Sequence, residues 1–362
     1  MGFALLLAAA VALPAAAQTP AGYPAPVEGD YLARNFVFAS GETLAELRLH
    51  YTTIGTPVRD AGGTVRNAVL IMHGTGGSGR GFLSQNFAGQ LFGPGQLLDA
   101  TRYFIILPDG IGHGKSSKPS DGLHMKFPKY SYDDMVKAQY LVLTEGLKLN
   151  HLRLVMGTSM GAMHTWVWGY TYPDFMDALL PLASNPVEIA GRNRMMRRMI
   201  IDDIESDPDW KQGEYTTQPR GLTAAAEVLL LMTSVPLQWQ HELPTRAMAD
   251  SALHARLARS LRTLDANDMI YQFEASREYN PLPHLEQIRA PLFAINSADD
   301  QVNPPELGIL DREIKRVPRG RYILIPISEQ TRGHGTHSLP AIWGGYLTEL
   351  LQASHRPDSP VP

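Results

Sequence analysis

The segment G-T-S-M-G at residues 157–161 constrains the fold more than any other part of the chain. It follows an apolar run at 152–156 and precedes a stretch with helical character at 162–172. Glycines on both sides of Ser159 allow a sharp strand-to-helix turn that strains the serine backbone and exposes its hydroxyl. Backbone N–H groups at the start of the helix are then placed to stabilise an oxyanion beside that hydroxyl. The pattern therefore predicts a nucleophilic serine rather than a Gly-Ser turn without chemistry.

Short apolar runs elsewhere in the chain are typical of buried strands in a parallel sheet. They lie at residues 68–72, 103–107, 152–156, 291–295 and 322–325. Residues 44–54 alternate between apolar and polar side chains, which suits an antiparallel strand at the start of the sheet. Helical patterns separate the runs at residues 132–147, 162–172 and 339–351. This alternation predicts an α/β fold with a mostly parallel, doubly wound sheet.

Residues 186–283 differ from the rest of the chain, because they contain no convincing buried strand. Helix-like pieces lie here at residues 193–204, 222–233 and 247–264. We expect a helical cap, inserted into a core formed by residues 41–185 and 284–355. Sites in open α/β sheets lie at the carboxyl ends of the strands, so a cap at that edge would roof a pocket.

Length and composition agree with one capped domain and exclude several classes of function. The 362 residues suffice for a large core with an insertion. The formal net charge is -4 and there is no strong basic stripe, which argues against nucleic acid as a partner. The chain has no cysteine, and this excludes disulfides, thiolate metal sites and a cysteine nucleophile.

The start of the chain carries a separate signal. An apolar run at residues 3–11, followed by small residues up to Ala17, is typical of a secretory signal peptide at residues 1–17, although no Lys or Arg precedes the run. The run is too short to span a bilayer as a helix, so we expect no stable membrane insertion. Residues 18–40 begin with several prolines and are expected to form an extended lead-in. We therefore expect a periplasmic or secreted protein.

The segment H-G-T-G-G-S at residues 73–78 directly follows the apolar run at 68–72. In a fold with this serine turn, one oxyanion donor follows the nucleophile and the second comes from such a loop. We predict the backbone N–H groups of Met160 and Thr75 as the two donors, with Gly74 as the alternative to Thr75. A phosphate-binding loop does not fit, because no Gly-Lys-Ser/Thr follows at the required spacing.

A serine nucleophile needs a histidine base, and the base needs an acid that orients it. With this serine turn, the acid and then the histidine follow in chain order. Asp299 and Asp300 come just after the apolar run at 291–295, and the spacing D-x-x-x-P favours Asp300 over Asp299. His334, in a Gly-His-Gly setting after the last predicted strand, is favoured as the base over His337.

Two histidines three residues apart also raise the possibility of a metal site. No third ligand lies at motif spacing, so we predict neither a metal nor another cofactor. Met163 in the predicted helix after Ser159, and Trp239 and Tyr271 in the cap, are candidates to line an apolar substrate pocket. For each of these three side chains, packing in the core is the alternative.

Taken together, these motifs make the sequence similar to the homoserine O-acetyltransferase-like branch of the α/β-hydrolases. The similarity covers residues 44–350, and its most specific pieces lie at residues 157–163, 172–174, 207–210, 213, 215 and 265–268. The loop with Asp300 and the pair Gly333-His334 complete it. The resemblance implies an α/β-hydrolase fold with an inserted helical cap, a Ser159–Asp300–His334 triad, and a monomer or homodimer.

The sequence departs from this branch directly after the predicted histidine base. Members of the branch carry an aspartate there that helps to hold the amino group of homoserine, whereas this chain has Gly335. Residues 108–113 are also closer to those of ordinary hydrolases. An exported enzyme would moreover meet no acetyl-CoA. We therefore predict a serine hydrolase that cleaves a small-molecule carboxylic ester or lactone through an acyl-enzyme on Ser159. The alternative is an acyl-CoA-dependent O-acyltransferase.

Overall fold

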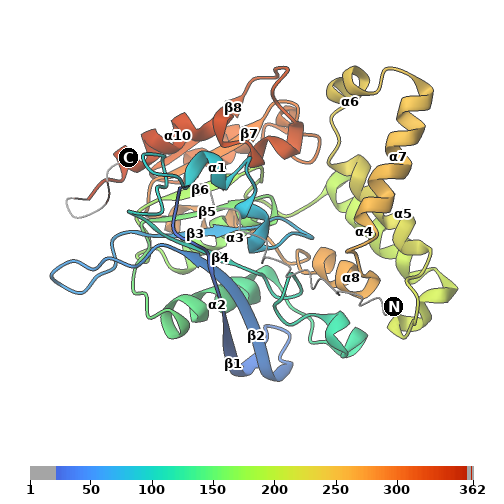
Figure 1. Ribbon diagram of the computed structural model, residues 1–362, viewed down its shortest axis with the longest axis horizontal. Helices are drawn as coiled ribbons and strands as arrows, with labels where there is room; N and C mark the ends of the chain where they lie inside the picture. The colour runs from blue at the N-terminus through green and yellow to red at the C-terminus, as the bar shows by residue number, and fades with distance from the viewer. Residues whose placement is uncertain (1–21, 357–359, 361–362) are drawn as a thin grey trace, which may run out of the picture.

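An eight-stranded sheet forms the centre of the computed structural model, which describes residues 22–356 and 360 (Figure 1). In spatial order its strands are β1 (Val27–Val37), β2 (Thr43–Ile54), β4 (Phe104–Pro108), β3 (Ala68–Met72), β5 (Leu154–Thr158), β6 (Leu179–Leu182), β7 (Leu292–Ser297) and β8 (Gly320–Ile325). The β1–β2 and β2–β4 pairs are antiparallel, and all the other pairs are parallel. The predicted fold class is therefore confirmed.

Each apolar run predicted as a strand is present, with its bounds shifted by two residues at most. Two strands were missed. β1 lies inside the predicted lead-in, and it was missed because most of its side chains are exposed and leave no apolar run. β6 has only four residues and includes a proline, which disguises a strand in the sequence. The predicted signal peptide lies outside the described residues.

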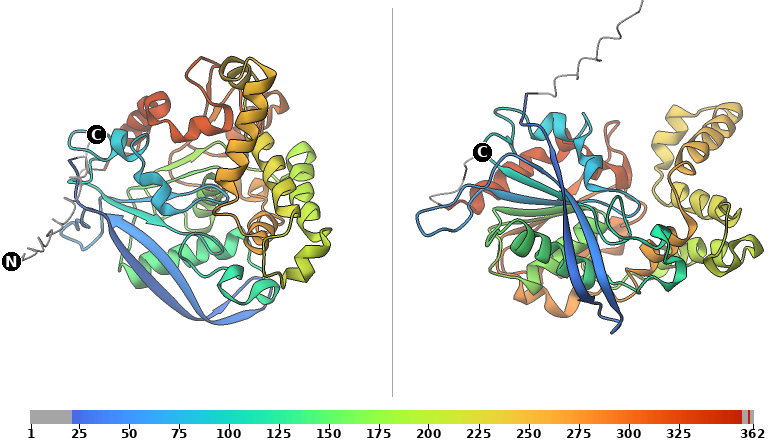
Figure 2. Two further views of the ribbon diagram at one scale, coloured as in Figure 1. Left: turned by 45° about the vertical axis from the view of Figure 1, so that its right-hand side comes forward. Right: turned by 60° about the horizontal axis from the view of Figure 1, so that its bottom comes forward.

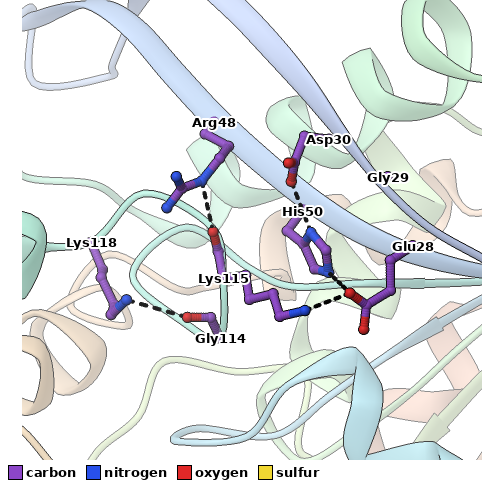
Figure 3. A pocket seen from close by; sticks show the side chains of 8 residues that line it. All are labelled: Glu28, Gly29, Asp30, Arg48, His50, Gly114, Lys115 and Lys118. Atoms are coloured by element: carbon purple, nitrogen blue, oxygen red, sulfur yellow. Dashed lines mark hydrogen bonds and ion pairs between the residues drawn. The ribbon is translucent and has the colours of Figure 1, made fainter.

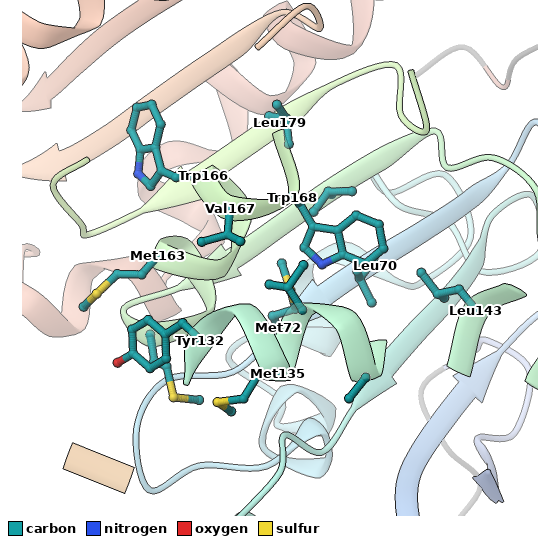
Figure 4. Close-up of a cluster of buried hydrophobic side chains, with 14 of the residues drawn as sticks. Leu70, Met72, Tyr132, Met135, Leu143, Met163, Trp166, Val167, Trp168 and Leu179 are labelled. Carbon is teal, nitrogen blue, oxygen red and sulfur yellow. The ribbon is translucent and has the colours of Figure 1, made fainter. Parts of the chain in front are cut away.

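Two layers of helices bury the two faces of the sheet. Helices α2 (Tyr132–Leu141) and α3 (Met160–Thr171) pack with Leu70 and Met72 of β3 on one face, as Figure 4 shows. Helices α1 (Ala88–Leu91) and α10 (Pro340–Ala353) cover Val69 and Ile71 on the other face. α9 (Ile309–Glu313) lies between β7 and β8 in the chain. Because β3 is buried on both faces, it reads as a continuous apolar run in the sequence.

All the regular elements in the segment between β6 and β7 are helices. It contains α4 (Gly191–Glu205), α5 (Gly221–Met232), α6 (Pro236–Glu242), α7 (Arg246–Ser260) and α8 (Ala266–Glu274). These helices have a small core of their own, in which Ile201, Leu222 and Phe273 are buried. Figures 1 and 2 show α4 to α7 stacked beside the sheet, with α8 between them and the core. We call residues 191–274 the cap.

Across the described residues, no single helix has both the length and the apolar composition to cross a membrane. The pair α5 and α6 meets that criterion when its two helices are joined, although they are bent by 101°.

Two buried histidines make the stability of this fold depend on pH. Burial, with a smaller contribution from the nearby His73, lowers the pKa of His164 in α3 to about 3. Burial likewise lowers the pKa of His337 to about 3, with a smaller contribution from His334. Both side chains are therefore neutral in the folded protein at neutral and mildly acidic pH.

The free energy of unfolding should fall as the pH falls through this window. The unfolded chain protonates both histidines below about pH 6.5, whereas the folded protein resists until about pH 3. The stabilisation is thus complete above about pH 6.5 and decreases below it. We expect a lower urea midpoint at about pH 4.5 than at about pH 7.5, and a smaller difference in His164→Gln. The control is His254→Gln at an exposed position, and an equal change in both variants would contradict the assignment.

Candidate active site

Ser159 lies in the turn between β5, which ends at Thr158, and α3, which begins at Met160. Its backbone angles are φ 54° and ψ −112°. A residue other than glycine rarely takes such a conformation, and the strain is tolerated where the surrounding structure fixes it at a functional site. The turn therefore has the geometry of the nucleophile elbow that the sequence predicted.

The glycines on both sides of Ser159 are required by space. A Cβ atom on Gly157 would lie 2.2 Å from the carbonyl of Gly161, and one on Gly161 would lie 2.0 Å from the carbonyl oxygen of Met72. In both cases the obstacle is backbone, which cannot turn aside as a flexible side chain can. The elbow exists because the helix, the strand before it and the neighbouring strand β3 approach one another this closely.

His334 connects Ser159 to Asp300. Its Nε2 lies 2.8 Å from Ser159 Oγ, and its Nδ1 lies 2.9 Å from Asp300 Oδ2. Asp300 follows β7, and His334 lies in the short 3₁₀ helix Gly333–Ser338 after β8. Since the carboxylate accepts the Nδ1–H proton, Nε2 is left to accept the proton of the serine hydroxyl. The structure thus brings together the three residues predicted from the sequence.

The carboxylate of Asp300 is fully buried and remains ionised. Burial by itself raises its pKa, but His334 and the backbone N–H groups of Val302 and Asn303 outweigh that effect and hold the pKa below its ordinary value. The two N–H groups donate to Oδ1 over 2.7 Å and 3.2 Å. Asp300 therefore presents a fixed negative charge to His334, which can stabilise a positive imidazole.

The competing acid has other partners, and the competing base has no carboxylate partner in the described part of the chain. Asp299 accepts hydrogen bonds from Ser297 Oγ over 2.5 Å and from Thr331 Oγ1 over 2.8 Å. It thereby fastens the loop that precedes His334. His337 lies edge-on to His334, with 5.3 Å between the ring centroids, and the lowered pKa described above keeps it neutral. The geometry directs Asp300 and His334, rather than these neighbours, to Ser159.

The loop after β3 borders the serine. A Cβ atom on Gly74 would lie 3.2 Å from Ser159 Cβ. Within residues 22–356 and 360, no protein acceptor is paired with the backbone N–H of Thr75 or of Met160. The hydroxyl of Thr75 is also buried without a partner in this part of the chain. Both predicted donors are therefore unpaired in the described residues, and the same holds for the N–H of Gly74, so the choice of Thr75 over Gly74 stays a prediction.

The three predicted substrate-binding side chains lie in different surroundings. Met163 is buried one turn after Ser159 in α3, and its N–H donates to the carbonyl of Ser159 over 3.0 Å. The hydroxyl of Tyr271 donates to the carbonyl of Phe127 over 2.5 Å, which gives this side chain a structural function. Trp239 lies in α6, where the guanidinium of Arg256 is 4.7 Å from the centre of its ring. The structure does not bring these three side chains together.

A cavity of about 350 Å³ lies between the cap and the loop at residues 73–78, which we call the oxyanion loop. Gly76 and Gly77 line it from the core, and Asp268 and Gln272 line it from α8. Gln272 Nε2 donates to the carbonyl of Gly112 over 2.9 Å. Burial raises the pKa of Asp268 to about 6. Sequence reasoning missed both cap residues, although Asp268 lies in one of the segments that carried the family resemblance.

A second cavity, of about 430 Å³, lies between β1, β2 and the loop at residues 114–118 (Figure 3). Its charged side chains pair with one another. His50 Nδ1 lies 2.8 Å from Asp30 Oδ1, and Lys115 Nζ lies 2.5 Å from Glu28 Oε2. Paired charges of both signs do not favour one class of ligand. The described residues contain no cluster of three or more His, Asp or Glu side chains placed to hold a metal ion.

Comparison with known proteins agrees with this geometry. A family model described as alpha/beta hydrolase fold matches residues 67–326. A probable acyltransferase of Methanothermobacter thermautotrophicus is 29% identical over 290 residues, which cover 80% of this chain and 87% of that protein. A homoserine O-acetyltransferase of Pelobacter propionicus is 32% identical over 272 residues, which cover 70% of this chain and 68% of that protein. The solved structure of an acetylester hydrolase from Corynebacterium glutamicum matches with a TM-score of 0.78 at 22% identity, covering 90% of this chain and 96% of the other.

The chain belongs to the α/β-hydrolase family, because the family model covers most of its length. Within that family it belongs to the homoserine O-acetyltransferase-like branch, as the identity to the Pelobacter enzyme shows. The resemblance drawn from the sequence is therefore confirmed. The likeness to the solved structure, at 22% identity, shows the fold alone.

The close approach of the elbow to β3 generates a test of stability. Gly161→Ala would place its methyl group against the carbonyl of Met72, so we expect a loss of about 3 kcal/mol or more in the free energy of unfolding. The control is Gly345→Ala in α10, where a Cβ atom would meet nothing within 4 Å. There we expect a gain of about 0.5–1 kcal/mol, because alanine is the better helix former. Urea unfolding measures both, and equal stability of the two variants would show that the contact is not tight.

Proposed function

We propose that the chain is an acyl-transfer enzyme that forms an acyl-enzyme on Ser159 and passes the acyl group to a hydroxyl acceptor. The observation that carries the proposal is the pair of hydrogen bonds by which His334 connects Ser159 to Asp300. A serine that is activated by a histidine, which is itself oriented by a buried carboxylate, has the arrangement required for nucleophilic attack on a carbonyl carbon.

The acylation step follows from the positions of these atoms. His334 Nε2 takes the proton as Ser159 Oγ bonds to the acyl carbon, and the carbonyl oxygen becomes an oxyanion. The N–H groups of Thr75 and Met160 stabilise that charge. When the tetrahedral intermediate collapses, the bond to the leaving group breaks, and His334 gives its proton to the leaving oxygen or sulfur. Asp300 stabilises the positive imidazole between these two proton transfers.

The second half of the reaction repeats these steps with an acceptor hydroxyl in place of the serine. Two relatives support transfer to an alcohol, since one is named a probable acyltransferase and the other a homoserine O-acetyltransferase. The donor would be an acyl thioester or ester, and the transferred group a short acyl chain.

Ester hydrolysis is the second candidate, and Gly335 favours it. The resemblance implies an aspartate at this position that holds the amino group of homoserine, and Gly335 has no side chain to do so. An enzyme that cannot hold its acceptor loses the acyl group to water. The solved structure with the same fold is named an acetylester hydrolase.

Removal of the nucleophile tests the chemistry that both candidates share. Ser159→Ala should lower kcat for p-nitrophenyl acetate by about 10⁴-fold or more without unfolding the protein. Asp300→Asn should lower kcat by about 10³–10⁴-fold, because the imidazole loses its orienting charge. Asp299→Asn is the matched control, since it changes the adjacent carboxylate, and we expect a loss below about tenfold. If the two Asn variants exchange these effects, the assignment of the acid is wrong.

The choice between transfer and hydrolysis is tested by product partition. Acetyl-CoA or p-nitrophenyl acetate is offered with and without homoserine, and the ratio of O-acetylhomoserine to free acetate is measured. Transfer predicts that the acceptor raises this ratio, whereas hydrolysis predicts acetate alone. Gly335→Asp should raise the ratio in either case, because a Cβ atom there would meet only Arg332 Cβ, at 3.6 Å. An unchanged ratio in this variant would mean that position 335 does not select the acceptor.

A further inference from the structure

We propose that His73 is a positioning residue, which holds the peptide between Gly74 and Thr75 so that the Thr75 N–H is aimed at the oxyanion. This inference rests on the proposed acyl-enzyme at Ser159. It adds a residue to which the motif at residues 73–78 gave no separate role, and it explains why the oxyanion loop begins with a histidine.

The hydrogen bonds of His73 determine which ring nitrogen carries the proton. His73 follows β3 directly and is only 5% exposed. The backbone N–H of Gly110 donates to Nε2 over 3.0 Å, so Nε2 must be the acceptor. The proton of the neutral ring is therefore on Nδ1, which donates to the carbonyl of Gly74 over 2.8 Å. A positive ring would place two N–H groups against each other at Gly110. Burial also lowers the pKa of His73, which favours the neutral ring for a second reason.

The carbonyl of Gly74 and the N–H of Thr75 belong to one planar peptide group. In a trans peptide these two groups point in opposite directions, so fixing the carbonyl also fixes the N–H. Gly77 N–H donates to the same carbonyl over 3.0 Å. Two donors thus hold the oxygen on the side away from the Thr75 N–H. They also polarise the peptide, which strengthens that N–H as a donor.

Nε2 of His73 accepts from a loop that buried hydrogen bonds hold in place. Gly110 follows Asp109, whose carboxylate accepts from Gly79 N–H over 2.7 Å and from Lys115 N–H over 2.8 Å. Asp109 is buried, and so is the ring of His113, whose centroid lies 5.0 Å from that of His73. His73 therefore transmits the position of the loop after β4 to the oxyanion loop after β3, which borders Ser159.

Two substitutions separate the two hydrogen bonds of the ring. The amide nitrogen of Asn lies close to the place of Nδ1, so His73→Asn can still donate to the Gly74 carbonyl. The amide oxygen of Gln lies close to the place of Nε2, so His73→Gln can accept from Gly110 but leaves the Gly74 carbonyl without this donor. We expect His73→Asn to keep kcat for p-nitrophenyl acetate within about fivefold, and His73→Gln to lose about 10²-fold with KM little changed.

A transition-state analogue gives the readout that a merely structural residue would not change. A trifluoromethyl ketone adds to Ser159 and forms an oxyanion, so its affinity should fall in His73→Gln by the same factor as kcat/KM. The matched control is His164→Gln, a buried histidine that contacts Gln139 rather than the oxyanion loop. We expect this control to alter kcat by less than about threefold.

Equal kcat values in the Asn and Gln variants would overturn the proposal. Should either variant fail to fold, nitrogen NMR of the wild-type protein decides, since the proposal requires a proton on Nδ1 and none on Nε2 of His73. The other tautomer, or a charged ring, would contradict it. These outcomes are distinct from a failure of the proposed function. If the Ser159→Ala variant kept its activity, the acyl-enzyme on Ser159 would be contradicted whatever the state of His73.

Discussion

The site depends on the packing of the elbow helix α3 against the backbone of β3. Gly161 lies so close to Met72 that a side chain would reach within 2.0 Å of the carbonyl oxygen. The chain runs from Met72 directly into His73 and Gly74, so the contact that fixes α3 also fixes the start of the oxyanion loop. The distance between the nucleophile and that loop is therefore set by backbone against backbone. Such a contact holds reacting groups more rigidly than long side chains could, because the backbone of a buried strand cannot rotate away.

Chemically similar neighbours in the site differ in the groups that each buried side chain contacts. Asp299 and Asp300 are adjacent and both are buried, yet Asp299 is held by two hydroxyl groups, whereas Asp300 faces the ring of His334. His334 and His337 also lie close together, but only His334 has a carboxylate partner. A charged ring without such a partner is costly in the interior, and for this reason His337 remains neutral. The catalytic geometry is thus a matter of which group each buried side chain meets, and not of which residue types are present.

The sequence predicts those parts of the structure that depend on local pattern. The strands around β3 and the elbow at Ser159 were found because buried parallel strands and close glycines leave marks within a few residues. The chain order of acid and histidine also located Asp300 and His334. The edge strand β1 was missed because its stability comes from pairing with β2 and not from apolar side chains. The position of Tyr271 could not be inferred, because its hydroxyl bonds to Phe127, far away in the sequence.

In the proposed reaction, the triad alone does not select the acceptor of the acyl group. Water and an alcohol use the same acyl-enzyme and the same base, so the product ratio depends on how well an acceptor hydroxyl is held near His334 relative to water. Gly335 contributes no side chain to that task. The cavity beside the oxyanion loop is lined by Asp268 and Gln272 of α8 and, from the core, by Ser78, His113 and Lys118 among others. An acceptor that entered this cavity would meet α8 of the cap and not Gly335, which does not line it.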